Sequence, residues 1–162
     1  MTTQDVQDKR LDSIDIALIG ALSKNARVTN AHLAADAGIA PSTAHARHRA
    51  LERGGIVRGY HASVDQAALG RGLQAIIGIT LRPGSRQTSI ERFAAEVGAL
   101  PQVLQVFFVG GTDDFLVHVA VADSSELRTV VVDHLSSQHS VASTRTSVVF
   151  AYQRNALAAP FD

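Results

Sequence analysis

The chain has 162 residues and no formal net charge, and 46% of its residues are hydrophobic against 19% charged. This length suits one average domain or two small ones, and the hydrophobic fraction excludes a largely disordered chain. The absence of cysteine excludes a disulfide scaffold, cysteine-ligated zinc, iron–sulfur clusters and thiol chemistry. The polar start is unlike a signal peptide, and apolar runs such as 115–122 are too short to span a membrane, so we expect a soluble, cytoplasmic protein with no membrane partner.

The neutral total conceals a basic stretch in the first part of the chain. Residues 1–60 carry eight Lys/Arg and six Asp/Glu, whereas residues 61–162 carry seven and nine. Between Lys24 and Tyr60 there are six basic residues and two acidic ones, and four of the six fall within twelve residues. This pattern indicates one element that faces a polyanion, although arginines can also simply solvate a helix surface.

The first sixty residues predict three short helices. The first runs from a cap at Asp12 to about Lys24, because its apolar residues are spaced for one face. Thr29 or Asn30 caps the second helix, and Gly38 follows it as a residue that tolerates left-handed φ. These features predict a tight turn into a third helix.

The third helix is predicted to begin at Pro41 and to run to about Arg53. Proline suits the first turn of a helix, where its missing N–H costs nothing. The side chains expected to face inward are those of Ala44, His48 and Leu51. Gly54-Gly55 ends the helix, and residues 56–64 are predicted to form an extended hairpin segment. Two short helices joined by a tight turn predict a helix-turn-helix.

The rest of the chain alternates between strands and helices. Residues 65–74 contain two glycines and no clear period, which predicts a linker. Beyond it we predict strands over 77–81, 103–109, 114–121 and 147–152, and helices over 90–97 and 123–135. This β-α-β-β-α-β order is the ferredoxin-like pattern, so the fold class is α+β.

A sheet of this kind carries helices on one face. Its other face would expose Ile, Val and Phe side chains to solvent, and exposed apolar patches of that size indicate an interface. We therefore predict that residues 75–162 form an oligomerisation module and that the chain forms at least a homodimer.

A series of short motifs, in order and with consistent spacing, resembles one known family. The N-terminal motifs are Leu11-Asp12-x-x-Asp15, Ala26-Arg27, Leu33-Ala34, Gly38-Ile39-x-Pro41-Ser42-Thr43, Leu51-Glu52, Gly55-Ile56-Val57 and Gly59-Tyr60, and the C-terminal motif is Gly111-x-x-Asp114-Phe115-Leu116. From about Leu11 to Tyr152 the chain resembles the leucine-responsive regulator/asparagine-synthetase regulator (Lrp/AsnC) family of bacterial and archaeal transcription factors. The resemblance implies a winged helix-turn-helix DNA-binding domain at 1–64 and a ferredoxin-like effector-binding and oligomerisation domain at 75–162. It also implies dimers that assemble into higher oligomers, with no cofactor.

Two positions depart from the family pattern. Ala40 stands where the family often has a capping Ser, and we expect Ser42 or Thr43 to compensate. His48 stands at a core-facing position where Ile or Val is usual.

The candidate DNA-binding residues are the polar and basic ones outside the apolar face of the third helix and just after it. If that helix enters a major groove, its side chains reach base edges, and Arg can bind guanine bidentately. Later arginines are better placed for phosphates, which position the protein without specifying sequence. The candidate base-contacting set is Ser42, Thr43, His45, Arg47 and Arg49, and the candidate phosphate-contacting set is Arg53 and Arg58. The expected partner is double-stranded DNA.

The resemblance implies a second site for an amino-acid effector, in a cleft between dimers. Backbone amides around Gly111, Thr112 and Asp113 would suit the effector carboxylate, and Asp114 would suit its ammonium. Thr144 and Thr146 are the candidate hydroxyl partners. The alternative is that Asp114 only caps the turn before a strand.

Two other functions remain open at this point. Ferredoxin-like folds also form dimeric α/β-barrel enzymes, here around His118 or Asp114, and a constitutive architectural DNA-binding protein would share every DNA-binding feature but bind no effector. The seven histidines lack the spacing of a metal site, and no nucleophile elbow accompanies the serines. We therefore expect a regulator rather than an enzyme, with no catalytic residue and no metal.

Overall fold

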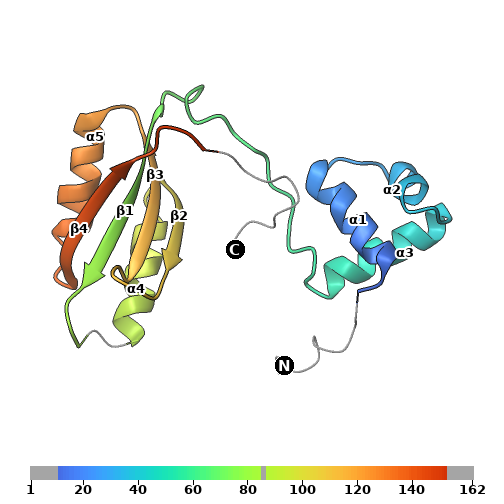
Figure 1. Cartoon of the computed structure of the whole chain (residues 1–162), viewed down its shortest axis with the longest axis horizontal. Coiled ribbons are helices and arrows are strands. Elements are labelled where there is room, and N and C mark those ends of the chain that lie inside the picture. The colour runs from blue at the N-terminus through green and yellow to red at the C-terminus, as the bar shows by residue number, and fades with distance from the viewer. Residues whose placement is uncertain (1–10, 85–86, 153–162) are drawn as a thin grey trace. The chain divides into compact units, whose positions relative to one another are not determined.

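The protein is described by a computed structural model over residues 11–84 and 87–152, in two compact units (Figure 1). Residues up to Ser63 belong to the first unit, and Val64–Tyr152 forms the second. The first unit contains α1 (Ser13–Lys24), α2 (Asn30–Asp36) and α3 (Pro41–Arg53). The second contains β1 (Leu73–Leu81), α4 (Gln87–Gly98), β2 (Val103–Phe108), β3 (Phe115–Val121), α5 (Ser124–Thr129), the π-helix η1 (Val130–Ser136) and β4 (Val141–Val148). The predicted domains also included residues 1–10 and 153–162, which lie outside the described residues.

Side-chain caps determine where the first two helices begin. The Asp12 carboxylate accepts hydrogen bonds from the backbone N–H groups of Ile14 and Asp15 at 3.0 and 2.9 Å, as predicted for a cap. The Asp15 carboxylate accepts from the Asp12 N–H at 3.4 Å, which completes a capping box. Of the two predicted caps for α2, Thr29 is the one used, because its hydroxyl accepts from the His32 N–H at 3.3 Å.

The turn into α3 confirms one prediction and overturns another. Gly38 has a φ of 64°, a conformation that favours glycine, as expected between α2 and α3. Ala40 occupies the N-cap position of α3 without a side-chain hydrogen bond. Neither Ser42 nor Thr43 supplies one, so the expected compensation was wrong. The helix start is instead stabilised by Pro41 and by the Asn30 side chain, which donates to the Pro41 carbonyl at 2.8 Å.

The first unit has a small core, and its predicted hairpin is absent. The core residues are Leu18, Leu22, Leu33, Ala34, Ala44 and Leu51. Residues 56–64, all described, contain no strand, so the prediction of a hairpin segment was wrong. The backbone N–H groups of Ile56 and Val57 instead return to the Leu51 carbonyl, at 2.9 and 3.2 Å, and close the end of α3. A hairpin would need such donors for a ladder between strands.

The second unit is a four-stranded antiparallel sheet with strand order β2-β3-β1-β4. A short connection joins β2 to β3, and the other two connections contain α4 and the α5–η1 helix. The helices cover one side of the sheet (Figure 1). This arrangement confirms the predicted β-α-β-β-α-β order.

The last strand begins six residues earlier than predicted and ends four residues earlier. We expected a strand over residues 147–152. Instead β4 is an edge strand over Val141–Val148, and of its residues Val141 is buried while most of the others are exposed. Edge positions need little hydrophobic alternation, so the polar sequence concealed the strand. Thr144 and Thr146 therefore lie within β4 rather than before it.

The predicted helix over 123–135 is also divided in the structure. Its first part is α5, capped as predicted by Asp123, and its second part is η1. The Ser137 N–H donates at 3.1 Å to the carbonyl of Val132, five residues earlier, which is the π-helical spacing. The wider turn keeps Val130 and Leu135 buried against the sheet.

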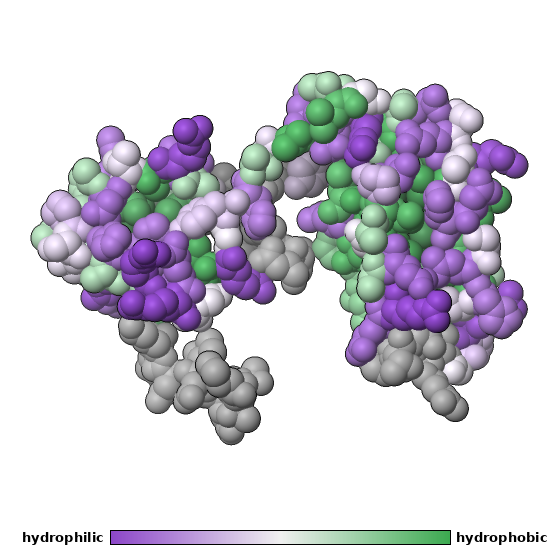
Figure 2. All heavy atoms as spheres, turned by 180° about the vertical axis from the view of Figure 1, so that it is seen from behind, coloured by the Kyte–Doolittle hydropathy of each residue, from purple (hydrophilic) through white to green (hydrophobic). Residues whose placement is uncertain are grey.

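The two faces of the sheet differ in what covers them. Alternation places Ile77, Val117 and their neighbours toward the helices, where they are fully buried, and places Ile76 and His118 on the opposite face. Ile76 is 40% exposed there. We call this opposite side the open face. Figure 2 shows hydrophobic residues at the surface of the second unit between hydrophilic ones. No helix in the described ranges is both long and apolar enough to cross a membrane.

Candidate nucleic-acid interface and effector loop

One side of α3 is exposed along its whole length. Ser42, His45, Arg49 and Arg53 are exposed and follow one another at three- and four-residue intervals, which places them on one face of a helix. We call these four residues, together with Ala46, the exposed stripe. Ala46 was missed by the sequence reasoning because it is neither polar nor charged, although its helical spacing was available as a signal. A methyl group at this place suits contact with a thymine methyl.

Two further candidates lie beside the stripe. Thr43 is exposed in the first turn of α3. Arg58 is exposed in the segment that follows the helix. Both positions are compatible with the predicted contacts to bases and phosphates.

Arg47 is placed differently from the other candidate DNA contacts. Its Nη1 lies 2.6 Å from an Asp12 oxygen and 2.9 Å from an Asp15 oxygen, so it joins α3 to the start of α1. The backbone hydrogen bond from Asp15 and the hydrogen bond from Arg47 hold the pKa of Asp12 below its usual value. The hydrogen bonds that Arg47 donates to the Asp12 and Asp15 carboxylates raise the pKa of Arg47. Arg47 thus contacts another helix instead of completing the exposed stripe.

His48 lies at the edge of the core in a polar cluster. Its Nε2 is 2.5 Å from the Tyr60 hydroxyl oxygen, and Tyr60 donates to a Glu52 oxygen at 3.0 Å. The Glu52 carboxylate also lies 3.4 Å from Arg49. The bond from Tyr60 lowers the pKa of Glu52, whereas partial burial and this bond raise the pKa of the Tyr60 hydroxyl. Sequence reasoning missed this cluster, although the four-residue interval from His48 to Glu52 was a signal for it.

The predicted effector loop folds back onto the end of β1. The Asp114 N–H donates to the Ile79 carbonyl at 2.8 Å, and the Asp114 carbonyl accepts from Val109 at 2.9 Å. One Asp114 side-chain oxygen accepts the Leu81 N–H at 2.6 Å, where the register between β1 and β4 shifts. The backbone donor that this carboxylate binds therefore lies in another strand, and not in the turn before β3 that the alternative interpretation assigned to it.

Asp113 lies over the open face of the sheet. One of its oxygens is 2.5 Å from Arg145 Nη2, and its side chain is 12% exposed against 67% for Arg145. A Cβ at Gly78 would lie 2.8 Å from the Asp113 carboxylate, so a side chain at this position would displace the carboxylate. The Thr80 hydroxyl donates to the Thr112 carbonyl at 3.3 Å, and Gly111 has a φ of 143°. Sequence reasoning missed Arg145 because it compared only the flanking threonines with the family pattern.

Thr144 and Thr146 lie on the other side of the sheet from this loop. They pair with Ile79 and Ile77, which face the helices, and the Thr144 hydroxyl is 3.1 Å from that of Ser136 in η1. The loop of residues 111–114 instead contacts the open face above Gly78. Within one chain, the predicted effector residues are therefore not brought together.

The two residues considered for an enzyme have separate partners. His118 Nε2 is 3.0 Å from the Gln74 side-chain oxygen on the open face, and burial lowers the pKa of His118. Asp114 precedes His118 by four residues along the direction of the strand. At the usual rise per residue of a strand, the two residues lie about 13 Å apart. Among the described residues, no group of three or more acidic or histidine side chains could hold a metal ion.

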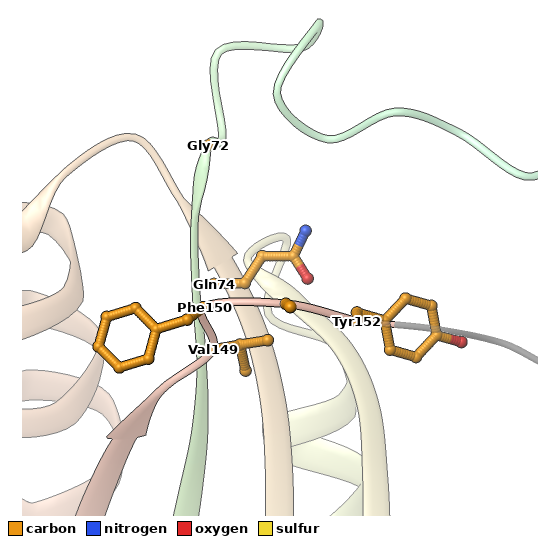
Figure 3. Close-up of a pocket in the computed structure, with 6 residues that line it drawn as sticks. Gly72, Gln74, Val149, Phe150 and Tyr152 are labelled. Carbon is orange, nitrogen blue, oxygen red and sulfur yellow. The ribbon is translucent and has the colours of Figure 1, made fainter.

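A shallow pocket lies at the beginning of β1, at the other end of that strand from the effector loop. Its lining comes from Gly72, Gln74 and the four residues that follow β4. Figure 3 shows the Phe150 and Tyr152 rings pointing away from one another. Phe150 is 95% exposed and Tyr152 is 70% exposed. The pocket contains none of the predicted site residues.

A helix-turn-helix with an exposed basic stripe, joined to a βαββαβ domain, defines a class of DNA-binding proteins with a separate second domain. Comparison with known families makes the assignment specific. The AsnC-type helix-turn-helix domain matches residues 11–52, and the Lrp/AsnC ligand binding domain matches residues 74–153. The chain belongs to the Lrp/AsnC family of transcriptional regulators and carries the DNA-binding helix-turn-helix of that family.

Individual relatives agree with this assignment over nearly the whole chain. The chain is 43% identical over 153 residues to the HTH-type transcriptional regulator AldR of Mycolicibacterium smegmatis, covering 94% of this chain and 89% of AldR. It is 33% identical over 141 residues to the leucine-responsive regulatory protein of Escherichia coli, covering 87% and 85%.

Solved structures show the same fold. The transcriptional regulator NMB0573 of Neisseria meningitidis, solved as a complex with L-Met, has a TM-score of 0.84 at 32% identity, covering 93% of this chain and 97% of that one. MtbAldR has a TM-score of 0.72 at 36% identity, covering 93% of this chain and the whole of that one.

Proposed function

We propose that this protein is a sequence-specific DNA-binding regulator whose oligomer responds to an amino acid or a related small metabolite. The observation that carries the proposal is the exposed stripe on α3, which offers a hydroxyl, an imidazole, a methyl group and two guanidinium groups on one helix face. The names of the relatives support the DNA-binding part. The L-Met in the NMB0573 structure supports an amino-acid effector.

On DNA, α3 enters the major groove. Arg49 binds guanine, while Ser42, Thr43 and His45 contact neighbouring bases or phosphates. Arg53 and Arg58 contact the phosphate backbone. Arg47 acts indirectly in this proposal, because its contacts to Asp12 and Asp15 hold α3 against α1. The paired α3 helices of a dimer meet half-sites about one helical turn, ~34 Å, apart.

The DNA part is tested with a duplex selected from a randomised pool by the wild-type protein. We expect Arg49→Ala to weaken binding roughly 5- to 150-fold and to relax sequence preference at one position. Arg53→Ala weakens binding to all sequences and reduces the slope of log K against log salt by about 1. The matched control is Arg92→Ala in α4, because Arg92 is also exposed and pairs with a glutamate, Glu96, on its own helix. If Arg49→Ala binds like the control, the exposed stripe is not the DNA interface.

The effector part centres on the ion pair of Asp113 and Arg145. An amino acid carries a carboxylate and an ammonium group. Its carboxylate can take the place of Asp113 beside Arg145, and its ammonium can take the place of Arg145 beside Asp113. Its carboxylate binds Arg145 and the backbone amides of residues 111–113, and its ammonium binds Asp113 or the second oxygen of Asp114. Thr144 and Thr146 lie on the opposite side of the same sheet, so in this proposal they reach the effector from another copy of the chain.

A thermal-shift screen of the twenty amino acids tests the effector. A binder raises the melting temperature in proportion to RT ln(1 + [L]/Kd). Asp113→Asn and Arg145→Gln should each remove most of this shift, while the exposed acid variant Asp133→Asn retains it. Asp114→Asn distinguishes the two acids, because it removes charge but keeps an acceptor for Leu81. A constitutive architectural protein would show no ligand-dependent shift with any of the twenty.

A further inference from the structure

A directed chain of hydrogen bonds joins the middle of α3 to the segment after it. The Tyr60 hydroxyl has one hydrogen, and it donates this hydrogen to Glu52 at 3.0 Å. A hydroxyl that donates to Glu52 can only accept from His48, whose Nε2 is 2.5 Å away, so this contact requires the form of the imidazole that carries a hydrogen on Nε2. The order is His48 to Tyr60 to Glu52, and it is the same for neutral and protonated His48. We call these three residues the Tyr60 clasp.

The Tyr60 clasp lies just beyond the last residues whose backbone N–H groups bind α3. Ile56 and Val57 are attached through the Leu51 carbonyl, and Val57 packs against the core. Residues 58–65, all described, contain no strand that could attach them by backbone pairing. Tyr60 reaches back with its side chain to His48 and Glu52, one turn apart on α3. The clasp thus holds the chain to α3 three residues beyond Val57, the last residue attached through its backbone.

Three side chains favour the ionised form of Glu52, which is the acceptor of the clasp. Glu52 is contacted by the Tyr60 hydroxyl, by Arg49 at 3.4 Å and by His48 at 3.7 Å. These contacts favour the carboxylate. The clasp is therefore intact at neutral pH, and it shares Glu52 with an arginine of the exposed stripe.

The length of chain that the clasp controls can be compared with the rise of DNA. Val57 stays bound through the Leu51 carbonyl, so loss of the clasp releases Gly59 and Tyr60, and two residues extend by up to ~7 Å. One base-pair step is ~3.4 Å, so this amounts to about two steps for each copy of the chain. A connector that leaves α3 at a fixed point restricts the separations at which two α3 helices can bind DNA together.

We propose that Tyr60 is a positioning residue for DNA recognition, which sets the separation of half-sites that the oligomer accepts. This inference rests on the proposed DNA-binding function. The Tyr60 side chain does not belong to the exposed stripe, and Arg49 keeps its own contact with Glu52 when the Tyr60 hydroxyl is removed. The hydroxyl therefore affects spacing and not the contact of one α3 helix with one half-site. In the family pattern Ile or Val is usual in place of His48, so the donor that completes the clasp is a feature of this chain.

The test uses the full-length protein and fluorescence anisotropy with two kinds of duplex. One kind carries a single half-site taken from the selected duplex, and the other carries two half-sites whose separation is varied by one base pair at a time. For wild type we expect affinity to fall at least ~10-fold when the separation is three base pairs from the optimum. For Tyr60→Phe we expect less than ~3-fold variation over the same range, with single-half-site affinity within about 2-fold of wild type.

Matched variants distinguish loss of the clasp from the general effect of removing a tyrosine hydroxyl or of changing His48. Tyr152→Phe makes the same atomic change at the other tyrosine of the chain, which is 70% exposed, and should keep the wild-type profile. His48→Gln retains an N–H donor and should keep the sharp profile, whereas His48→Leu should flatten it. Circular dichroism verifies folding, and His48→Leu carries the test if Tyr60→Phe fails to fold.

The outcomes distinguish this inference from the proposed function. If wild type binds no duplex from the pool, the proposed function fails. If wild type binds and Tyr60→Phe keeps the sharp spacing profile, the clasp is merely structural and the inference is overturned. A flat wild-type profile overturns it as well. So does an equal loss of affinity for single and paired half-sites, because Tyr60 would then act on α3 itself.

Discussion

The two units of this protein are stabilised in different ways. In the first, six buried hydrophobic residues form the core, and polar side chains at its edges connect one helix to the next. In the second, thirteen buried hydrophobic residues form the core, and two phenylalanines lie at its centre. The smaller unit buries less apolar surface, so more of its stability comes from specific polar contacts.

This difference indicates which kind of substitution should destabilise each unit most. Deletion of apolar atoms should affect the sheet unit most, because large buried side chains leave large cavities. Loss of a charge or hydrogen bond should affect the helical unit most, because the Arg47 ion pairs and the Asn30 hydrogen bond join separate helices. Function is distributed in the same way: DNA contacts are proposed on the unit held by polar links, and effector contacts on the unit with the larger core.

The largest expected effect is that of Phe115→Ala in the sheet unit. Phe115 is fully buried, and its ring centroid is 4.9 Å from that of Phe93 and 5.1 Å from that of Phe108. Truncation should lower the free energy of unfolding by ~3–5 kcal/mol. Urea unfolding followed by circular dichroism measures the change. Phe150→Ala is the control, because Phe150 is 95% exposed, and it should cost less than ~0.5 kcal/mol. Similar costs for the two variants would contradict the assigned core.

Arg47→Ala should have the next largest effect, in the helical unit. Removing the guanidinium breaks the contacts to Asp12 and Asp15 and leaves the Asp15 carboxylate, which is 10% exposed, without that cation. Amide hydrogen exchange should accelerate in α1 and α3 and remain unchanged in the sheet. Arg49→Ala, in contrast, should leave exchange unchanged and weaken DNA binding. Unchanged exchange with reduced DNA affinity in Arg47→Ala would restore Arg47 as a direct DNA contact.

Acid should destabilise the helical unit through its first cap. Because hydrogen bonds hold the pKa of Asp12 below its usual 3.8, the folded state binds fewer protons there than the unfolded state. The cap therefore contributes its full stability above pH 5 and loses it as the pH falls through 4 and below. Asp12→Asn should lower the protection of α1 from hydrogen exchange at pH 7, and its difference from wild type should shrink at pH 3. A difference that does not depend on pH would exclude this cause.

The smallest expected effect is a milder pH response of the sheet unit. Burial lowers the pKa of His118 below 6.5, so the unfolded state binds a proton that the folded state resists. The stability of the sheet should therefore decline slightly as the pH falls from 7 through 6. His118→Gln should flatten this part of the pH profile of the melting temperature, whereas the exposed His134→Gln should not. An unchanged profile in His118→Gln would show that another group titrates there.

Local chemistry made much of the fold predictable. Asp12 and Asp123 cap helices, Gly38 forms the turn with positive φ, and Pro41 starts α3, as each residue type favours. Hydrophobic periodicity located β1, β2 and β3 because their residues face a buried core. The edge strand β4 was misplaced for the opposite reason, since most of its side chains are exposed and leave no pattern.

The candidate sites were less predictable, because a side chain's partners come from distant parts of the chain. The sequence by itself determined the order of helices and strands, the helix-turn-helix and the polar residues of the exposed stripe, since these depend on residue type and short-range spacing. Only the tertiary structure decided that Arg47 binds α1, that Arg145 reaches Asp113 over Gly78, and that Thr144 faces the helices. Each of these contacts joins residues on separate elements, and their meeting depends on how whole elements pack and on the register of the sheet.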